Sequence, residues 1–163
     1  MPFIKTLVCL ASLAAASSLF AHGTSTTHVS TASAPKEQTD WGIAGNPRDV
    51  KRTIALSMTD RMRFEPDRIE VRQGDTVRLK VANRGRMRHE IVLGTPQTLG
   101  AHAELMKKYP AMEHDEAHMA HVPAGRQGDI VWKFNRVGEF AYACLISGHF
   151  EAGMVGQIVV RPR

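Results

Sequence analysis

A segment near the end of the chain carries three side chains whose donor atoms bind soft metal ions. Cys144, His149 and Met154 follow one another at intervals of five residues and offer a thiolate, an imidazole and a thioether. This spacing is too long for neighbours on one strand, but a loop between two strands can turn all three inward. Gly148 and Gly153 each precede one of these residues, and glycine permits the positive φ angles that such a loop needs.

A fourth donor is expected from a distant strand. His89 begins an apolar run about fifty residues before Cys144, and a β-sandwich brings such distant strands together. Two imidazoles and one thiolate in a trigonal set, with a weak axial thioether, form the blue or type 1 copper arrangement. Sulfur suits Cu(I) and imidazole suits both oxidation states, so such a site changes little on electron transfer. The residues predict one type 1 copper ion held by His89, Cys144, His149 and Met154.

Other interpretations of the same residues are open. Cys144 could be a buried core thiol, because cysteine is among the most buried residue types. Met154 could pack and His149 could occupy a turn. Zinc could replace copper, although a methionine ligand favours copper. A Cys–His nucleophile pair is disfavoured, because the sequence shows no residue that would orient His149 as a base.

The elements that would position these residues read as short strands. Residues 76–81 alternate apolar and polar with period two, and residues 129–134 do the same. About seven such strands, separated by turns, predict an antiparallel all-β sandwich. One helical insertion is expected to interrupt the sandwich. The spacing along one side of a short helix is seen for Leu99, Ala103, Leu105 and Met106. A second, polar piece runs from residue 112 to 121.

The first part of the chain resembles an export signal. Residues 1–21 combine a short positive segment with an apolar Ala/Leu-rich run and end at Ala21, a small residue. The apolar run is shorter than the roughly 20 residues of a membrane span, although a membrane anchor is the alternative. Residues 22–51 are rich in Ser, Thr, Ala and His and predict a flexible leader. A periplasmic protein with one domain over residues 52–163 is therefore expected, without a membrane span after cleavage.

Charge and cysteine content narrow the functional class. The formal net charge is +5, but the basic residues are scattered without interleaved aromatic side chains. Nucleic-acid binding is therefore not expected. Removal of residues 1–21 would also remove Cys9 and leave Cys144 alone. Exported proteins usually pair their cysteines, so a single thiol there must be buried, reactive or bound to metal.

From Arg52 to Arg163 the chain resembles the cupredoxins. The run Phe64-x-Pro66-x-x-Ile69-x-Val71-x-x-Gly74-Asp75-Thr76-Val77 is similar to the early strands of that family, and His89 and the 144–154 loop fall where its four copper ligands fall. Residues 108–115, taken with the loop, resemble a narrower group of periplasmic, CopI-like cupredoxins associated with copper tolerance. The resemblance implies a Greek-key β-sandwich with a type 1 copper site. Many members have Asn or Ser after the first histidine ligand, where it braces the cysteine loop, whereas this chain has Glu90.

A second group of metal-binding residue types lies between residues 112 and 121. His114, His118 and His121 are spaced so that a helix would place them on one face. Met112 and Met119 lie within the same stretch, and imidazole with thioether is a plausible donor set for additional, weaker copper. The alternative is a solvated polar segment.

A third candidate lies at the predicted cleavage point. Cleavage after Ala21 would expose His22, whose amine and imidazole could together chelate Cu(II). An unstructured leader is the competing interpretation.

These features predict a periplasmic copper protein that contributes to copper tolerance through copper binding and redox chemistry. The alternative is a soluble electron carrier that serves a periplasmic reductase or oxidase, with a periplasmic cytochrome or copper-handling protein as partner. An enzyme is not expected. The chain is too short for the second domain of a multicopper oxidase and lacks the histidine pairs of a trinuclear centre.

Overall fold

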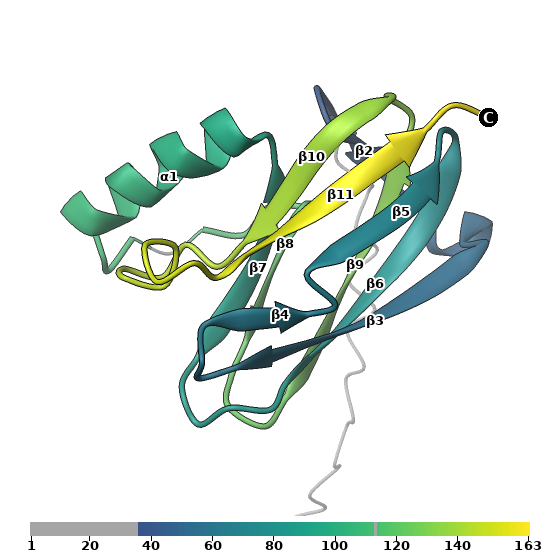
Figure 1. Cartoon of the computed structure of the whole chain (residues 1–163). Helices are drawn as coiled ribbons and strands as arrows, with labels where there is room; N and C mark the ends of the chain where they lie inside the picture. The colour runs from purple at the N-terminus through teal and green to yellow at the C-terminus, as the bar shows by residue number, and fades with distance from the viewer. Residues whose placement is uncertain (1–35, 113) are drawn as a thin grey trace, which may run out of the picture. The chain divides into compact units, whose positions relative to one another are not determined.

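The computed structural model describes residues 36–112 and 114–163, which form two facing sheets and one α-helix (Figure 1). The strands are β1 (Gln38–Thr39), β2 (Gly42–Ala44), β3 (Arg52–Thr59), β4 (Arg63–Glu65), β5 (Arg68–Arg72), β6 (Asp75–Asn83), β7 (His89–Gly94), β8 (Met119–Val122), β9 (Gln127–Phe134), β10 (Gly138–Ala143) and β11 (Val155–Arg161). A 3-10 turn (Pro47–Asp49) lies between β2 and β3, and helix α1 (Pro96–Lys108) lies between β7 and β8.

The predicted all-β sandwich is confirmed. One sheet has the strand order β1-β2-β9-β6-β3-β4 and the other has the order β5-β11-β10-β7-β8. Two of the neighbouring pairs, β3 with β6 and β5 with β11, run parallel, and the other pairs are antiparallel. Apolar and polar residues alternate along a strand in the same way whether its neighbour is parallel or antiparallel. The sequence pattern therefore could not distinguish these parallel pairs.

The core lies between the two sheets and consists of the inward-facing positions of the alternating strands. Val77, Leu79 and Val81 of β6 are fully buried, and so is Phe134 of the neighbouring β9. From the opposite sheet, Tyr142 of β10 enters the same cluster. Burial of this apolar surface is the main favourable contribution to folding, and it fixes the strand ends from which the candidate site is built.

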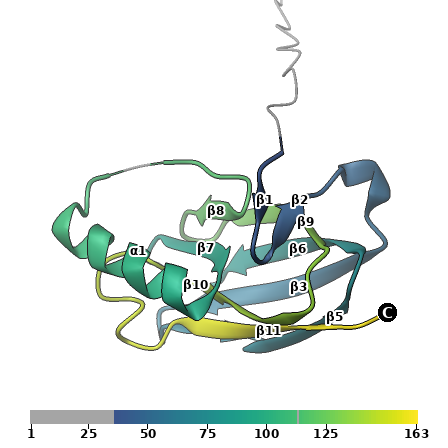
Figure 2. The ribbon, with the colours of Figure 1, turned by 90° about the horizontal axis from the view of Figure 1, so that it is seen from above.

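Helix α1 covers the outer side of the second sheet beside β7 and β10 (Figure 2). It begins at a capping box formed by Thr95 and Thr98. Leu99, Ala103 and Met106 are its buried residues, as the spacing predicted, but Leu105 is 47% exposed, so its assignment to that face was wrong. Because β7 lies between the core and α1, all of its residues are buried, including the polar ones.

Residues before Arg52 also join the sandwich. Strand β2 pairs with β9, and β1 pairs with β2, so residues 38–44 extend the first sheet instead of forming the flexible leader predicted over 22–51. The indole N–H of Trp132 donates to the backbone carbonyl of Trp41 and links this segment to the core. The predicted signal over 1–21 and His22 lie outside the described residues. No helix in the described ranges is long and apolar enough to cross a membrane.

Candidate metal centre

The loop between β10 and β11 closes an antiparallel hairpin in which Ala143 pairs with Val155. Cys144 directly follows β10 and Met154 directly precedes β11, so the two residues lie opposite each other where the loop begins and ends. The backbone N–H of Cys144 donates to the carbonyl of Met154 over 3.1 Å, and the N–H of Met154 donates to the carbonyl of His149 over 3.0 Å. These bonds hold the three residues at one end of the hairpin.

The backbone conformation of the loop depends on two glycines. Gly148 and Gly153 have φ angles of 88° and 87°, which side chains with a Cβ rarely adopt. Each directly precedes a candidate ligand, His149 or Met154, as the sequence analysis required. The chain can therefore turn sharply just before His149 and again just before Met154.

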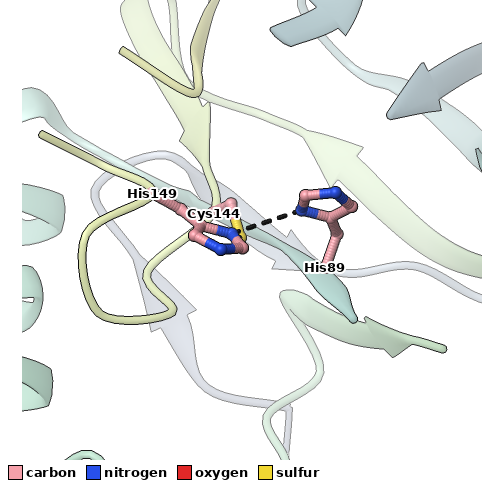
Figure 3. A group of neighbouring side chains, drawn as sticks. All are labelled: His89, Cys144 and His149. Atoms are coloured by element: carbon pink, nitrogen blue, oxygen red, sulfur yellow. Dashed lines mark hydrogen bonds between the residues drawn. The ribbon is translucent and has the colours of Figure 1, made fainter. Parts of the chain in front are cut away.

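Three donor atoms converge where this loop meets β7. His149 Nδ1 lies 3.2 Å from Cys144 Sγ and 3.3 Å from His89 Nδ1, and Figure 3 shows the two imidazoles facing each other. All three donor atoms lie within 4.8 Å of one another. For metal–ligand bonds of about 2.0–2.3 Å, tetrahedral or trigonal donors are separated by roughly 3.3–3.8 Å. The three residues therefore fit a single metal ion.

The fourth predicted ligand, Met154, is fully buried and belongs to the same core cluster as Cys144. Its backbone bonds to His149 and Cys144 place it beside the three converging donors. The predicted axial role of its thioether is consistent with this position and stays a prediction.

Burial makes the Cys144 thiol a poor acid. Desolvation raises its pKa to about 12, although the backbone N–H groups of Glu90 and Ile146 oppose the shift. Burial, together with neighbouring His89, lowers the pKa of His149 and favours its neutral imidazole. A bound cation would favour the ionised form of Cys144 over the protonated thiol, since thiolates are the form that binds metals. The site therefore provides a neutral imidazole donor at His149 and a thiol whose ionisation depends on a metal ion.

A carboxylate orients the first histidine. The Nε2 atom of His89 lies 3.2 Å from Asp60 Oδ1. Backbone N–H donation from Arg86, and further bonds from Met87 and His89, hold the pKa of Asp60 below its usual value. An ionised Asp60 can accept a hydrogen bond from His89 Nε2–H, and Nδ1 is the nitrogen directed at the other donors. Carboxylates commonly play this role behind metal-binding histidines.

Glu90 takes the place of the Asn or Ser that braces the cysteine loop in many cupredoxins. Its carboxylate Oε1 accepts the Leu145 backbone N–H over 3.0 Å, and its own backbone N–H is 3.4 Å from Cys144 Sγ. The second carboxylate oxygen lies 3.1 Å from His121 Nδ1 on neighbouring β8. Glu90 is only 4% exposed, so it joins the loop to two adjacent strands from inside the protein.

The second predicted cluster does not form one helical face. Residues 114–118 have no helix and residues 119–122 form β8, so the helical premise was wrong. His118 packs its ring edge-on against Trp41, 5.4 Å away between centroids, and lies near Trp132. Met119 is buried beneath α1. Within the described ranges, His89, Cys144 and His149 form the one cluster of three His, Cys, Asp or Glu residues with converging donor atoms.

The rest of the second cluster lies closer to the metal centre. The His114 ring faces that of His102 on α1, with 4.8 Å between centroids, and the His114 carbonyl lies 3.0 Å from His121 Nε2. Met112 and His121 line a pocket of about 310 Å³ that His149 also lines. Its sulfur and imidazole lining comes from Met87, Met106, Met112, His121 and His149. Sequence reasoning missed Met87, because nothing in its own segment indicates that its loop faces α1.

The brace formed by Glu90 can be tested in the metal-free protein. We expect Glu90→Leu to lower the free energy of unfolding by about 1–3 kcal/mol, because the buried N–H of Leu145 would lose its acceptor. Glu90→Gln keeps an oxygen in that position, so its free energy of unfolding should fall clearly less. Urea denaturation of both variants measures the difference, and equal losses would show that the hydrogen bond to Leu145 is not what Glu90 contributes.

Comparison with known proteins agrees with this geometry. Residues 50–161 match the family model described as copper binding proteins of the plastocyanin/azurin family. The chain is 46% identical over 157 residues to the copper-resistant cuproprotein CopI of Rubrivivax gelatinosus, with 95% of this chain and 94% of the relative covered. It is 28% identical over 151 residues to the protein of the same name from Pseudomonas aeruginosa, with 75% and 83% covered.

Among solved structures, auracyanin B superposes with a TM-score of 0.62 at 21% identity, over 74% of this chain and 96% of that protein. This likeness supports the fold. The family model covers most of the chain, and the relative from Rubrivivax gelatinosus matches nearly its whole length. The chain therefore belongs to the plastocyanin/azurin family of copper-binding proteins, and within that family it is a CopI-like cupredoxin.

Proposed function

We propose that this chain is a periplasmic type 1 copper protein that contributes to copper tolerance by copper binding and electron transfer. The ligands are His89, Cys144, His149 and Met154. The observation that carries the proposal is the convergence of one buried thiol and two imidazoles. Such a donor set, with a nearby thioether, is the type 1 copper arrangement.

The protein's own contribution is to hold these donors in one geometry. Bound copper supplies a one-electron couple at this position. The Asp60 carboxylate orients His89, and the Glu90 carboxylate fixes the backbone directly after Cys144. Because these partners come from the strands β3, β7 and β10 or their ends, the ligands have little freedom to rearrange when the charge at the centre changes. The buried position of Cys144 also protects its sulfur from oxidation.

The role in copper tolerance is supported by the relatives. Proteins of Rubrivivax gelatinosus and Pseudomonas aeruginosa that resemble this chain both carry the name copper-resistant cuproprotein. The periplasmic location is supported by the export-signal pattern of residues 1–21. In that compartment a protein that binds copper would limit the free concentration of the ion.

A second, weaker copper ion is part of the proposal. Met112 and His121 line the pocket that reaches His149, together with Met87 and Met106. Thioether and imidazole donors suit Cu(I). His118 and Met119 are packed elsewhere and His114 does not line this pocket, so we leave these three residues out of the site, although all lie in the stretch that the sequence singled out. His22 remains a separate candidate at the predicted new N-terminus.

The alternative is a soluble electron carrier to a periplasmic reductase or oxidase. The observation that favours it is the position of His149, which is buried at its donor atom but lines an open pocket at the surface. An imidazole in this position gives a partner protein a short path to the centre.

The four-ligand assignment predicts distinct optical effects. Cys144→Ala should abolish the intense visible absorption of the Cu(II)-loaded protein, because that absorption requires copper–thiolate charge transfer. Met154→Ala should retain copper but change the spectrum, since the axial ligand tunes the centre without dominating it. Visible and electron paramagnetic resonance spectra measure both effects. An unchanged spectrum for Met154→Ala would remove Met154 from the ligand set.

The physiological role is tested in a strain that lacks the gene. Complementation with the parent chain should restore growth on copper, and Cys144→Ala should fail to restore it although the protein is exported at an equal level. A copper sensitivity that does not change on deletion would contradict the role in tolerance. Full rescue by Cys144→Ala would show that tolerance does not need the type 1 site.

The second site is tested by stoichiometry. A Met112→Ala/His121→Ala variant should bind about one Cu(I) fewer than the parent and keep the visible spectrum of the type 1 site. The control is Met119→Leu, which changes a buried methionine of the same segment and should leave stoichiometry unchanged. If the double variant binds as much Cu(I) as the parent, these residues do not form a copper site.

A further inference from the structure

Two segments at the end of the sandwich where the metal centre lies carry several exposed arginines. Residues 60–65, which comprise the turn after β3 and the strand β4, and residues 84–88, between β6 and β7, together contain five arginines and two carboxylates. We call these five arginines the arginine collar: Arg61, Arg63, Arg84, Arg86 and Arg88. All five are exposed.

The two loops are joined to each other and to the ligand loop. The backbone N–H of Arg84 donates to the carbonyl of Met58, and the N–H of Arg86 donates to Asp60 Oδ2. The Arg63 guanidinium donates to the carbonyl of Ala152 in the ligand loop over 2.7 Å. The arginines are therefore held near His89 and His149 by tertiary contacts and are not only close in sequence.

The positive charge of the arginine collar is only partly neutralised. Asp60 is engaged with His89 and with two backbone N–H groups, and Glu65 pairs with Arg61. Within residues 36–112 and 114–163, no ion pair involves Arg84 or Arg86. Summed charges of one sign around a site steer oppositely charged molecules toward it and raise their association rates.

An apolar surface lies beside the arginine collar. Met87 and Met112 are 46% and 43% exposed, and both line the pocket that also contains Arg88, Ile146 and His149. A small apolar patch with a charged rim suits brief encounters, in which charge directs the approach and the limited contact area permits rapid release.

We propose that the arginine collar is the docking surface for an acidic one-electron redox protein, which exchanges electrons with the metal centre through His149. This inference rests on the proposed type 1 copper site. In the transfer, the reduced partner loses one electron and the cupric centre gains it, and no proton or chemical group moves. Carboxylates on the partner would approach Arg84 and Arg86, and its apolar surface would cover Met87 and Met112.

The charge preference can be measured with small inorganic reductants and the copper-loaded full chain. Stopped-flow reduction by anionic hexacyanoferrate(II) should slow as ionic strength rises, whereas reduction by cationic hexaammineruthenium(II) should accelerate. At low ionic strength, Arg84→Gln/Arg86→Gln should slow the anionic reagent by about three- to tenfold, a modest part of the range that steering can reach.

A matched control separates local charge from net charge. Arg72 ends β5, and Arg136 follows β9, at the end of the sandwich where β6 begins. Arg72→Gln/Arg136→Gln removes the same charge far from His149 and should change the rate less than twofold. Equal slowing by the two double variants would overturn the proposal, because the effect would then come from total charge.

A protein probe tests the partner class. An acidic c-type cytochrome should reduce the copper-loaded chain faster than a basic one, and Arg84→Gln/Arg86→Gln should remove the difference. Rates that do not distinguish the two cytochromes would overturn the docking proposal while leaving the redox centre intact. The variant could instead lose binding to anionic phosphatidylglycerol vesicles while its reduction rates stay unchanged. That result would make the arginine collar a membrane-binding surface and would also overturn the docking proposal. Failure of every reductant would instead contradict the proposed redox function.

Discussion

The burial of one thiol is the constraint on which the rest of the site depends. Cys144 is fully enclosed in the core between the sheets, and desolvation raises its pKa to about 12. A thiolate in this environment needs a cation, and His89 and His149 direct ring nitrogens toward the same point. Metal binding must therefore displace the thiol proton, which couples metal affinity to pH. The same enclosure that keeps the metal-free thiol protonated would hold the ligand residues in place around a bound ion.

Enclosure of this kind is possible because the fold supplies partners for the two polar side chains of β7 that lie beside the thiol. Strand β7 is buried on both sides, so its two polar residues, His89 and Glu90, depend on contacts within the protein. Asp60 satisfies His89, and Glu90 accepts the N–H of Leu145 while its other oxygen lies near His121. A buried polar group without such partners would cost free energy. The carboxylates therefore stabilise the fold and orient the ligands through the same contacts.

The sequence was sufficient for the parts of the site that are encoded locally. The spacing of Cys144, His149 and Met154, with glycines before the last two, predicted the loop, and the structure brings His89 to it. Contacts made across the fold were not predictable, because no periodic pattern marks them. Asp60 lies in the exposed turn that follows β3, and only the folded chain shows that its carboxylate reaches His89. The helical face proposed for residues 114–121 failed for the same reason, since pairing with β7 draws the end of that segment into a strand.

The measurement that tests the central claim most directly is X-ray absorption at the copper edge of the full chain loaded with one equivalent of copper. The account predicts a first coordination shell with one short sulfur ligand and two imidazole nitrogens, contributed by Cys144, His89 and His149. A shell that contains only nitrogen and oxygen would contradict it. In that case the buried thiol would be a core residue, and the copper would be held elsewhere in the chain.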